Sequence, residues 1–316
     1  YLRHVPPYAP DGTGAWFSVL NAGTRSVVVD LHTPEGPAAV LDMIAAHGFD
    51  VVVEGFRPGV MARLGLDPAA LVQRFPKLVV ASISGFGQDG PMVDLPGHDI
   101  GYVGFTGSLA TAARPGGVPT LPSVQVADMA GGALTAAMRV CAALFARERT
   151  GIGAWLDVSM TWGALALMAP VLGEVAVTGA DVAPGGELLT GALAVYGVYS
   201  CADGGLLALG AVEPKFQRAL AEGLGLELPL ERPAIATRLA TAPRDHWAEV
   251  LARACATAVL RPQEVLDAAL HRQRGAVVGE GTAARVCPPF PGPHAWVTAP
   301  APQLGAHTKE LIPSAR

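Results

Sequence analysis

The sequence predicts an α/β fold in which helices cover a parallel sheet. Three short apolar runs, Val27 to Val29, Phe49 to Phe56 and Lys77 to Gly87, alternate with segments of helical composition. Strands that alternate with helices are typical of βαβ units, in which the strands are parallel. Hydrophobic residues make up 51% of the 316 positions, which is enough for a large core.

Two helices are predicted between these strands. The first follows Asp30, with Thr33 as its N-cap and Pro34 at its first position, and it stops at Gly48. The second covers Pro68 to Phe75, after a turn that begins at Leu66.

From Asp128 to about Leu172 the pattern is helical, with an interruption between Arg149 and Val158. The most apolar stretch, Met129 to Ala146, contains Arg139, so we expect a buried core helix rather than a membrane span. Residues 173–190 are rich in glycine, which predicts a loop.

The last third of the chain predicts a second structural unit. A β-hairpin is expected over Val195 to Val212, with Asp203 and Gly204 in its turn, followed by two amphipathic helices. We therefore predict a large α/β domain over residues 1–196 and a small α+β domain over 197–285. A loop-like return to the large domain is expected over 286–316.

Composition excludes several functional classes. The net charge is −5 and no long basic run occurs, so a nucleic-acid partner is not expected. The four cysteines form no CxxC pair, which predicts buried reduced thiols and a cytoplasmic location. No signal peptide, membrane-spanning run or clustered metal-ligand spacing is evident.

Three positions are candidates for proton chemistry. His98 and Asp99 stand together after Gly97, which allows a ligand or a second backbone to approach closely. A histidine in such a loop is otherwise a structural hydrogen-bonding residue. Glu213 lies between an apolar strand and a predicted helix, where a carboxylate is either a cap or a catalytic group.

Asp128 precedes an apolar helical run, where free N–H groups and the helix dipole stabilise a carboxylate. It is either an N-cap or a functional group. Gly131 and Gly132 are poor helix formers, and two of them in a first turn indicate that something packs closely there. Arg57 and Arg63 are candidates for phosphate binding or are simply solvated.

Eight motifs in order resemble the family III CoA-transferases, also called CaiB/BaiF-like: RSVVVDLHTPEG, EGFRPGVMARLGL, SGFGQDGP, GHDIGY, VADMAGGAL, RERTGIGAWLDVSM, YSCADGGLLALGAVEPKF and PAPQLGAHT. GHDI and GAVEPKF are most similar to the α-methylacyl-CoA racemase branch. The resemblance implies a Rossmann-like large domain, a smaller domain and an interlocked homodimer with the active site between domains. It further implies an acyl-CoA substrate and neither a metal nor a nicotinamide cofactor.

In the racemase branch, the resemblance makes His98 and Glu213 one acid/base unit and places Asp128 on the opposite face of the substrate. Asp99 would support this unit. In the transferase branch, Asp128 would instead become an acyl anhydride and then a CoA thioester, and those enzymes generally lack the histidine. A third possibility is a non-catalytic homologue that binds acyl-CoA.

The same resemblance assigns Arg63 to the CoA phosphates and Tyr102 to the CoA or thioester site. The sequence also departs from the family. The first strand–helix unit has no counterpart, which predicts either an exposed sheet edge or an unfilled apolar face. NAGTRS (Asn21 to Ser26) replaces NRGKRS, His32 replaces a lysine, and GALAV (Gly191 to Val195) replaces a GGxP loop.

Overall fold

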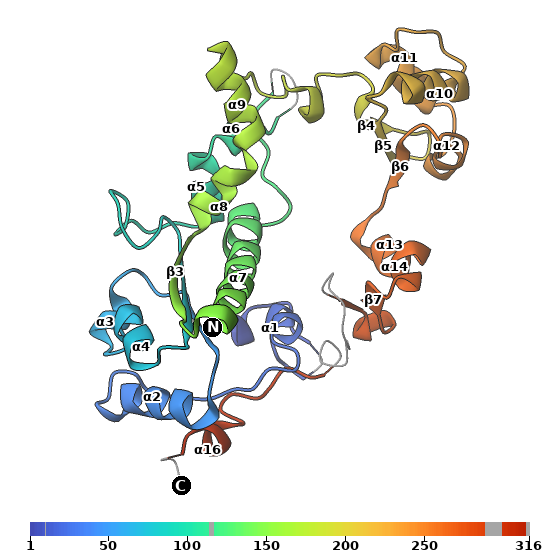
Figure 1. The fold of residues 1–316 in the computed structure, drawn as a ribbon. Coiled ribbons are helices and arrows are strands. Elements are labelled where there is room, and N and C mark those ends of the chain that lie inside the picture. Colours follow the sequence, from blue (N-terminus) through green and yellow to red (C-terminus); the bar gives the residue numbers. More distant parts are fainter. Residues whose placement is uncertain (10, 114–116, 288–298, 314–316) are drawn as a thin grey trace. The chain divides into compact units, whose positions relative to one another are not determined.

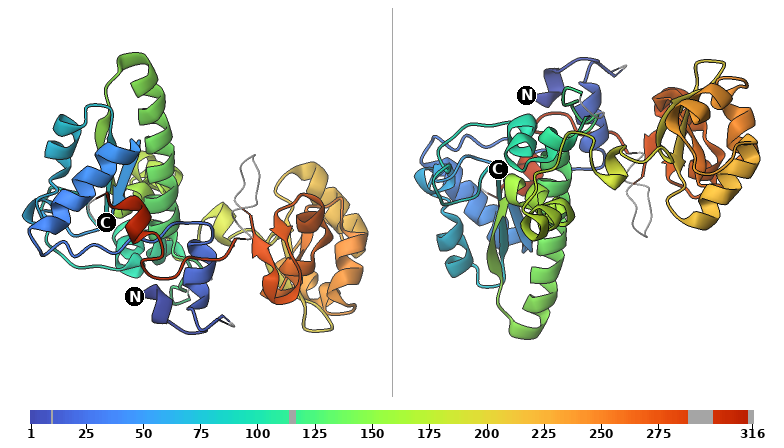
Figure 2. Two further views of the ribbon diagram at one scale, coloured as in Figure 1. Left: turned by 90° about the horizontal axis from the view of Figure 1, so that it is seen from below. Right: turned by 90° about the horizontal axis from the view of Figure 1, so that it is seen from above.

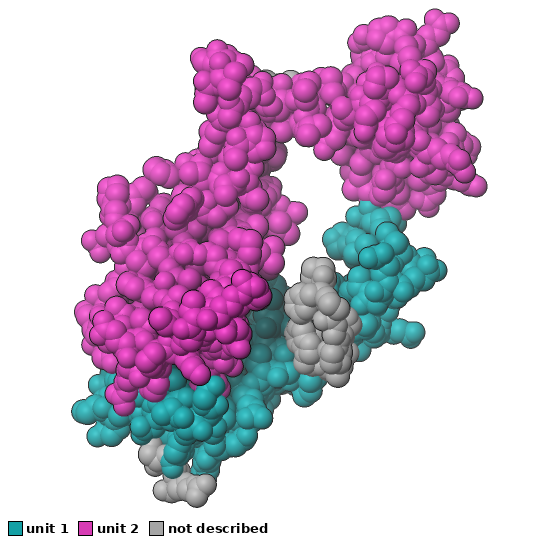
Figure 3. Space-filling model, viewed as in Figure 1, with its two compact units in different colours: residues 1–48, 260–316 teal, residues 49–259 magenta. Residues whose placement is uncertain are grey.

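The computed structural model describes residues 1–9, 11–113, 117–287 and 299–313 (Figure 1). It divides into two compact units, one formed by residues 1–48 and 260–316 and the other by residues 49–259 (Figure 3). The predicted domain boundaries at 196 and 285 follow a different division and stay a prediction. Each unit is described separately below.

A parallel sheet organises the first half of residues 49–259. Its strands β1 (Val51–Glu54), β2 (Val79–Ser84) and β3 (Ala154–Ser159) lie in that order. The predicted α/β class with a parallel sheet is confirmed. β2 is the central strand and is almost wholly buried, as expected for a parallel strand covered on both faces. β3 falls inside the interruption predicted at 149–158, where no strand was expected.

The first predicted strand, Val27 to Val29, is wrong. This segment lies beside the C-terminal residues: the Val28 N–H donates to Thr308 Oγ1 at 3.0 Å, and the His307 N–H donates to the Ser26 carbonyl at 2.9 Å. A strand needs a ladder of backbone partners. Here part of the bonding goes to side chains, so no ladder forms.

Helices connect the parallel strands (Figures 1 and 2). α4 (Pro68–Arg74) begins where the Asp67 carboxylate accepts a hydrogen bond from the Ala69 N–H at 2.8 Å. α7 (Thr135–Thr150) packs on β2 and β3, and α8 (Met160–Leu167) follows β3 directly. The loop predicted over 173–190 is wrong at its start, because α9 (Ala169–Thr178) continues to Thr178; η3 (Leu188–Thr190) lies near its end.

The predicted buried core helix is wrong for one face of α7. The helix that runs from Ala127 to Thr150 has few buried side chains, and Met138 and Phe145 are 67% and 61% exposed. This helix is long and apolar enough to cross a membrane. The core helices of soluble proteins can have the same length and composition. Its outer face is therefore apolar without being covered in the single chain.

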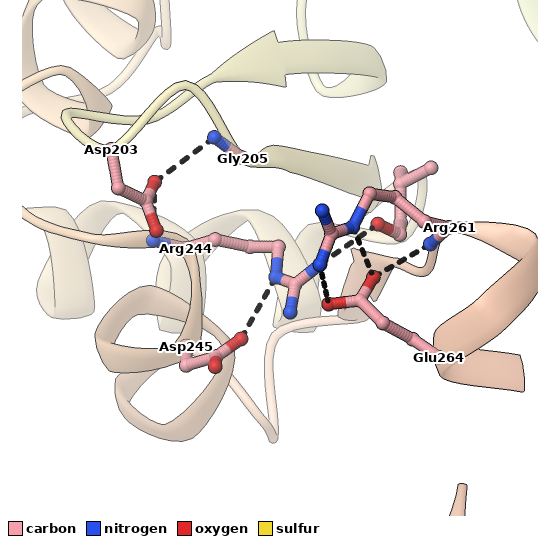
Figure 4. Close-up of polar contacts among 7 residues, drawn as sticks. Asp203, Gly205, Arg244, Asp245, Arg261 and Glu264 are labelled. Carbon is pink, nitrogen blue, oxygen red and sulfur yellow. Dashed lines mark hydrogen bonds and ion pairs between the residues drawn. The ribbon is translucent and has the colours of Figure 1, made fainter. Parts of the chain in front are cut away.

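The predicted hairpin is confirmed as β4 (Tyr196–Ser200) and β5 (Leu206–Gly210), which pair antiparallel; β6 (Ala256–Val259) pairs antiparallel with β5. At the turn, the Asp203 carboxylate accepts hydrogen bonds from the Gly205 N–H at 3.0 Å and the Arg244 N–H at 3.2 Å (Figure 4). These bonds lower the pKa of Asp203. α10 (Pro214–Leu224), α11 (Arg232–Leu239) and α12 (Arg244–Val250) pack their apolar faces into this core.

The unit formed by residues 1–48 and 260–316 consists mainly of short elements. They are η1 (Leu2–His4), α1 (Ala15–Leu20), α2 (Glu35–His47), α13 (Pro262–Asp267), α14 (Ala269–Gln273), β7 (Val277–Val278), η4 (Gly281–Ala283), β8 (Arg285–Val286) and α16 (Thr308–Leu311). β7 and β8 pair antiparallel. At the start of α13 the Arg261 N–H donates to Glu264 Oε2 at 2.7 Å (Figure 4).

α2 ends at Gly48 as predicted, with Gly48 in the left-handed conformation at φ 60°. The predicted N-cap is wrong by one residue. Pro34 occupies the cap position, and the Thr33 hydroxyl donates to the Asp30 carbonyl at 3.1 Å. Threonine hydroxyls form such local bonds in turns as readily as they form caps.

All four cysteines are free thiols. Cys201 and Cys287 are buried as predicted, whereas Cys141 and Cys255 are exposed. The prediction that every thiol is buried is therefore wrong. Cys141 lies on the uncovered face of α7, which explains its exposure.

Candidate active site

The loops that follow β1 and β2 line a cavity of about 490 Å³. Phe56 and Arg57 come from the loop after β1, and Gly85, Phe86 and Gly87 come from the loop after β2. In open α/β sheets, ligands bind outside the carboxyl ends of the strands. The cavity therefore lies where the fold itself favours a ligand.

His98 and Asp99 begin α5 (Asp99–Phe105) rather than forming an isolated loop. His98 is the N-cap residue, with extended backbone angles, and Asp99 is the first helical residue. The His98 side chain is part of the lining of the 490 Å³ cavity and also of a second cavity of about 280 Å³. This residue is thus the border between the two spaces.

Asp128, which is 29 residues further along the chain, lies next to Asp99. Its backbone N–H donates to Asp99 Oδ1 at 2.9 Å. Of the two alternatives for Asp128, the N-cap is wrong, because Asp128 lies in the first turn of η2 (Ala127–Leu134), a π-helical segment that continues into α7. Since Asp99 already occupies the Asp128 N–H, this donor is not free to bind a thioester oxygen.

The structure brings three of the predicted site residues together. His98, Asp99 and Asp128 all line the 280 Å³ cavity. Its other lining residues are mainly apolar, from α5, from α6 (Ser108–Thr111) and from the loop before η2: Ile100, Val103, Leu109, Leu121, Pro122 and Gln125. An imidazole and a carboxylate thus border one space, an arrangement suited to general acid–base chemistry.

Burial and charge act together on Asp128. Desolvation is the largest cause that raises the pKa of this carboxyl group, the negative charge of Asp99 raises it further, and His98 lowers it. A carboxyl group with a raised pKa returns a proton more readily than an ordinary carboxylic acid is able to at the same pH. Asp99 therefore tunes Asp128 electrostatically as well as holding its backbone.

Tyr102 lines the 490 Å³ cavity, and its ring lies between Gly85 and Gly97. A Cβ added at Gly85 would lie 2.5 Å from the ring, and one added at Gly97 would overlap it. The close approach predicted at Gly97 is therefore made by this ring. The Phe86 ring packs edge-on against the Tyr102 ring, with 5.2 Å between the two ring centroids. Burial, Asp128 and Asp99 raise the pKa of Tyr102, against the effect of Arg57, so the phenol stays protonated at neutral pH.

Gly131 and Gly132 also have a packing partner. A Cβ at Gly131 would overlap the Met160 carbonyl and lie 2.8 Å from the Ala164 nitrogen, and one at Gly132 would lie 2.9 Å from Met160 Cγ. The predicted close packing is confirmed, and α8 provides it. These glycines therefore hold η2 against α8 and do not mark a ligand contact.

The other predicted residues lie elsewhere. Arg63 ends α3 (Val60–Arg63) and is exposed, and Glu213 is the exposed residue before α10. Neither lines the 490 or the 280 Å³ cavity, so their proposed roles stay predictions. Of the two arginines considered from sequence, Arg57 is the one at the cavity.

Sequence reasoning did not single out Phe86 or Gln125 as site residues. Phe86 lies in SGFGQDGP, one of the eight motifs that carry the family resemblance. Its position at the carboxyl end of a predicted buried strand is the signal that could have identified it. Among the described residues, no cluster of three or more His, Cys, Asp or Glu side chains is suited to hold a metal ion.

The model of CoA-transferase family III matches residues 1–308. The chain belongs to this family. An acyl-CoA substrate is consistent with membership of this family.

Relatives in family III include both isomerases and transferases. The chain is 35% identical to α-methylacyl-CoA racemase of Homo sapiens over 325 residues, covering 96% of this chain and 84% of the relative. It is 33% identical to succinyl-CoA–D-citramalate CoA-transferase of Chloroflexus aurantiacus over 239 residues, covering 76% and 58%. Family membership alone leaves the reaction open.

A solved CaiB/BaiF family protein from Brucella suis has the same fold. Its TM-score is 0.82 at 23% identity, covering 98% of this chain and 87% of that chain. This likeness supports the mixed α/β architecture with its parallel sheet.

Proposed function

We propose that the protein is a racemase or epimerase of 2-methylacyl-CoA thioesters that works by 1,1-proton transfer. The observation that carries this proposal is the shared lining of one cavity by His98 and Asp128. The 35% identity to α-methylacyl-CoA racemase over 96% of the chain supports it.

The chemistry follows from the acidity of the substrate. A hydrogen next to a thioester carbonyl is weakly acidic, so its removal needs a positioned base and stabilisation of the enolate. One of the two groups removes the proton from one face, and the other returns a proton to the opposite face. In the reverse direction, His98 and Asp128 exchange roles. We propose Glu213 as the partner of His98 and Arg63 as a CoA phosphate ligand, as the family resemblance implies; no further cofactor is required.

CoA transfer through Asp128 is the second candidate, because family III relatives of this chain include transferases. In that reaction the Asp128 carboxylate attacks the thioester, CoA leaves as a thiolate, and an acyl anhydride forms. The thiolate then attacks the Asp128 carbonyl of the anhydride, which gives an Asp128–CoA thioester and releases the first acid. An acceptor carboxylate attacks this thioester and forms a second anhydride with release of the thiolate, which then attacks the acceptor's carbonyl to give the new acyl-CoA and free Asp128. This reaction has no need of His98, which is why the racemase proposal ranks first.

Incubation of the full chain with a single enantiomer of 2-methylacyl-CoA in deuterated water separates these candidates. Racemisation places deuterium at the α-carbon and destroys optical purity. A transferase instead moves labelled CoA to an acceptor acid, and Asp128→Asn abolishes that movement. Binding of acyl-CoA without either signal identifies a non-catalytic homologue.

We also propose that residues 1–196 form a Rossmann-like large domain and that the protein forms an interlocked homodimer. The uncovered apolar face of α7 supports the second part, since monomeric proteins rarely leave such a face open. Light scattering of the full chain should then give twice the mass of one chain.

Replacing Asp99 by Asn should shift the acid limb of the pH–rate profile to lower pH. The negative charge of Asp99 raises the pKa of Asp128, so its removal lowers that pKa and keeps Asp128 ionised in more acidic solution. Asn retains an oxygen that can accept the Asp128 N–H bond. The shift is partial, because burial is the largest cause of the raised pKa.

The measurement is kcat/KM against pH for the enantiomer that Asp128 deprotonates. Asp94→Asn, which neutralises an exposed carboxylate outside both cavity linings, is the matched control and should leave the limb in place. A limb that stays fixed or moves to higher pH in Asp99→Asn would contradict the electrostatic role of Asp99.

A further inference from the structure

One wall of the 490 Å³ cavity is formed by residues 85–87 of the loop after β2. The near end of this loop is fixed by α8, because the Gly85 carbonyl accepts hydrogen bonds from the Thr161 N–H at 3.0 Å and from the Thr161 hydroxyl at 2.7 Å. In the middle of the loop, the Phe86 ring packs on the Tyr102 ring. The shape of the wall therefore depends on how firmly the far end of the loop is held.

The far end is held by a carboxylate from the neighbouring strand β3. Asp157 Oδ2 accepts a hydrogen bond from the Gln88 N–H at 3.0 Å. The preceding N–H, that of Gly87, donates to Ser84 Oγ at 3.1 Å. A Cβ placed on Gly87 would lie 3.4 Å from Asp157 Oδ2, so the carboxylate lies directly against the loop backbone. Asp157 lines neither the 490 nor the 280 Å³ cavity, and it therefore contacts the wall without contacting the space inside.

The surroundings of Asp157 do little to stabilise its charge. Within the part of the chain that the structure describes, Asp157 Oδ1 and Gln88 Nε2 are buried without a hydrogen-bond partner. No ion pair among the described residues involves the Asp157 carboxylate, and Arg139 donates to the main-chain carbonyl of Asp157 instead. A buried carboxylate with so few partners costs free energy. Its charge does, however, strengthen the bond to the Gln88 N–H relative to a neutral acceptor.

We propose that Asp157 is a positioning residue, whose carboxylate holds the backbone of Gln88 and thereby keeps the Phe86 wall of the 490 Å³ cavity in the shape that receives the substrate. The effect on substrate binding rests on the proposed function, whereas the hold on the loop does not. A carboxylate kept in a costly environment is explained by this contact, because the contact fixes a cavity wall that residues inside the cavity do not fix.

The proposed proton-transfer groups are held by other contacts. His98 caps α5, where its carbonyl accepts a hydrogen bond from the Gly101 N–H at 2.8 Å. The Asp128 N–H is bound by Asp99. Loss of the Asp157 carboxylate should therefore loosen the wall and leave these two groups in place. In steady-state kinetics, KM should then rise while kcat changes less.

The direct test is hydrogen–deuterium exchange of the full chain without substrate, resolved to single amides by mass spectrometry. Asp157→Ala removes the acceptor and should speed exchange of the Gln88 N–H by about tenfold or more, the factor that a hydrogen bond to a charged group contributes. Asp157→Asn retains a neutral oxygen and should speed it by about threefold, since neutral hydrogen bonds are roughly half as strong. The amides of β2 should exchange as in the wild type.

Asp89→Ala is the matched control, because Asp89 is an exposed carboxylate in the next position that lines neither cavity. It should leave exchange at Gln88 unchanged. A folded Asp157→Ala variant with wild-type exchange at Gln88 would overturn the inference. If that variant does not fold, wild-type exchange in Asp157→Asn would overturn it. Exchange that rises equally at Gln88 and throughout β2 would also do so, since Asp157 would then act on the stability of the sheet.

The second readout is the kinetics of racemisation. Asp157→Ala should raise KM about tenfold with kcat within about threefold of the wild type, and Asp89→Ala should change neither. A wild type that exchanges no α-hydrogen would refute the racemase proposal, and exchange at the Gln88 amide would still decide whether Asp157 holds the loop. A racemase in which Asp157→Ala loosens the loop but leaves KM unchanged would refute the positioning role alone.

Discussion

Replacing His98 by Ala or Asp128 by Asn is expected to slow inversion of a 2-methylacyl-CoA by about 100-fold or more. Inversion needs a base on one face of the carbon and an acid on the other, and each variant removes one of them. The two residues line the same cavity but come from α5 and η2, so neither can substitute for the position of the other.

The two variants should also differ from each other in a diagnostic way. With His98 absent, Asp128 can still remove and return a proton on its own face, so one enantiomer exchanges deuterium with retention. With Asp128 replaced, the opposite enantiomer should do so. Exchange is followed by mass spectrometry and configuration by chiral separation, with Asp94→Asn as the control. Normal inversion in either variant would refute the site assignment.

Gly131→Ala is expected to destabilise the protein by ~1–3 kcal/mol, the usual cost of overpacking a close contact. The added Cβ would meet the backbone of Met160 and Ala164, which cannot rotate away as a side chain can. Gly163→Ala should act similarly, because its Cβ would lie 2.6 Å from the Gly131 Cα. The contact joins η2, which carries Asp128, to α8.

The measurement is the urea midpoint at unchanged slope. Gly173→Ala in α9 is the matched control, because no atom lies within 4 Å of its added Cβ. It should stabilise its helix by ~0.5–1 kcal/mol, since alanine loses less conformational entropy than glycine. Equal midpoints for Gly131→Ala and Gly173→Ala would show that η2 and α8 are not in close contact.

Local patterns determined much of the framework. The apolar runs predicted β1 and β2, Gly48 predicted the end of α2, and Asp203 with Gly204 predicted the hairpin turn. Each of these features depends on residues that are neighbours in the chain, so the sequence alone was sufficient. The family resemblance, carried by motifs in order, was confirmed by the match to family III over residues 1–308.

Only the tertiary structure decided the features that join distant segments. β3 was missed because its partner β2 lies about 75 residues earlier, as in the pair Val80 and Trp155. The apolar composition of α7 predicted burial, but whether a face is covered depends on what packs against it.

The same holds within the site. Sequence placed Asp99 beside His98, and the family resemblance made it a support of the His98 and Glu213 unit. The structure adds a contact that sequence did not predict, in which the Asp99 carboxylate accepts a hydrogen bond from the Asp128 N–H. The residue pattern offered both Arg57 and Arg63 and the family resemblance favoured Arg63, but it is Arg57 that the loop after β1 brings to the cavity. Residue type and spacing thus determined which groups can do the chemistry. Which of them share a cavity depended on contacts between segments far apart in the chain, which local patterns do not encode.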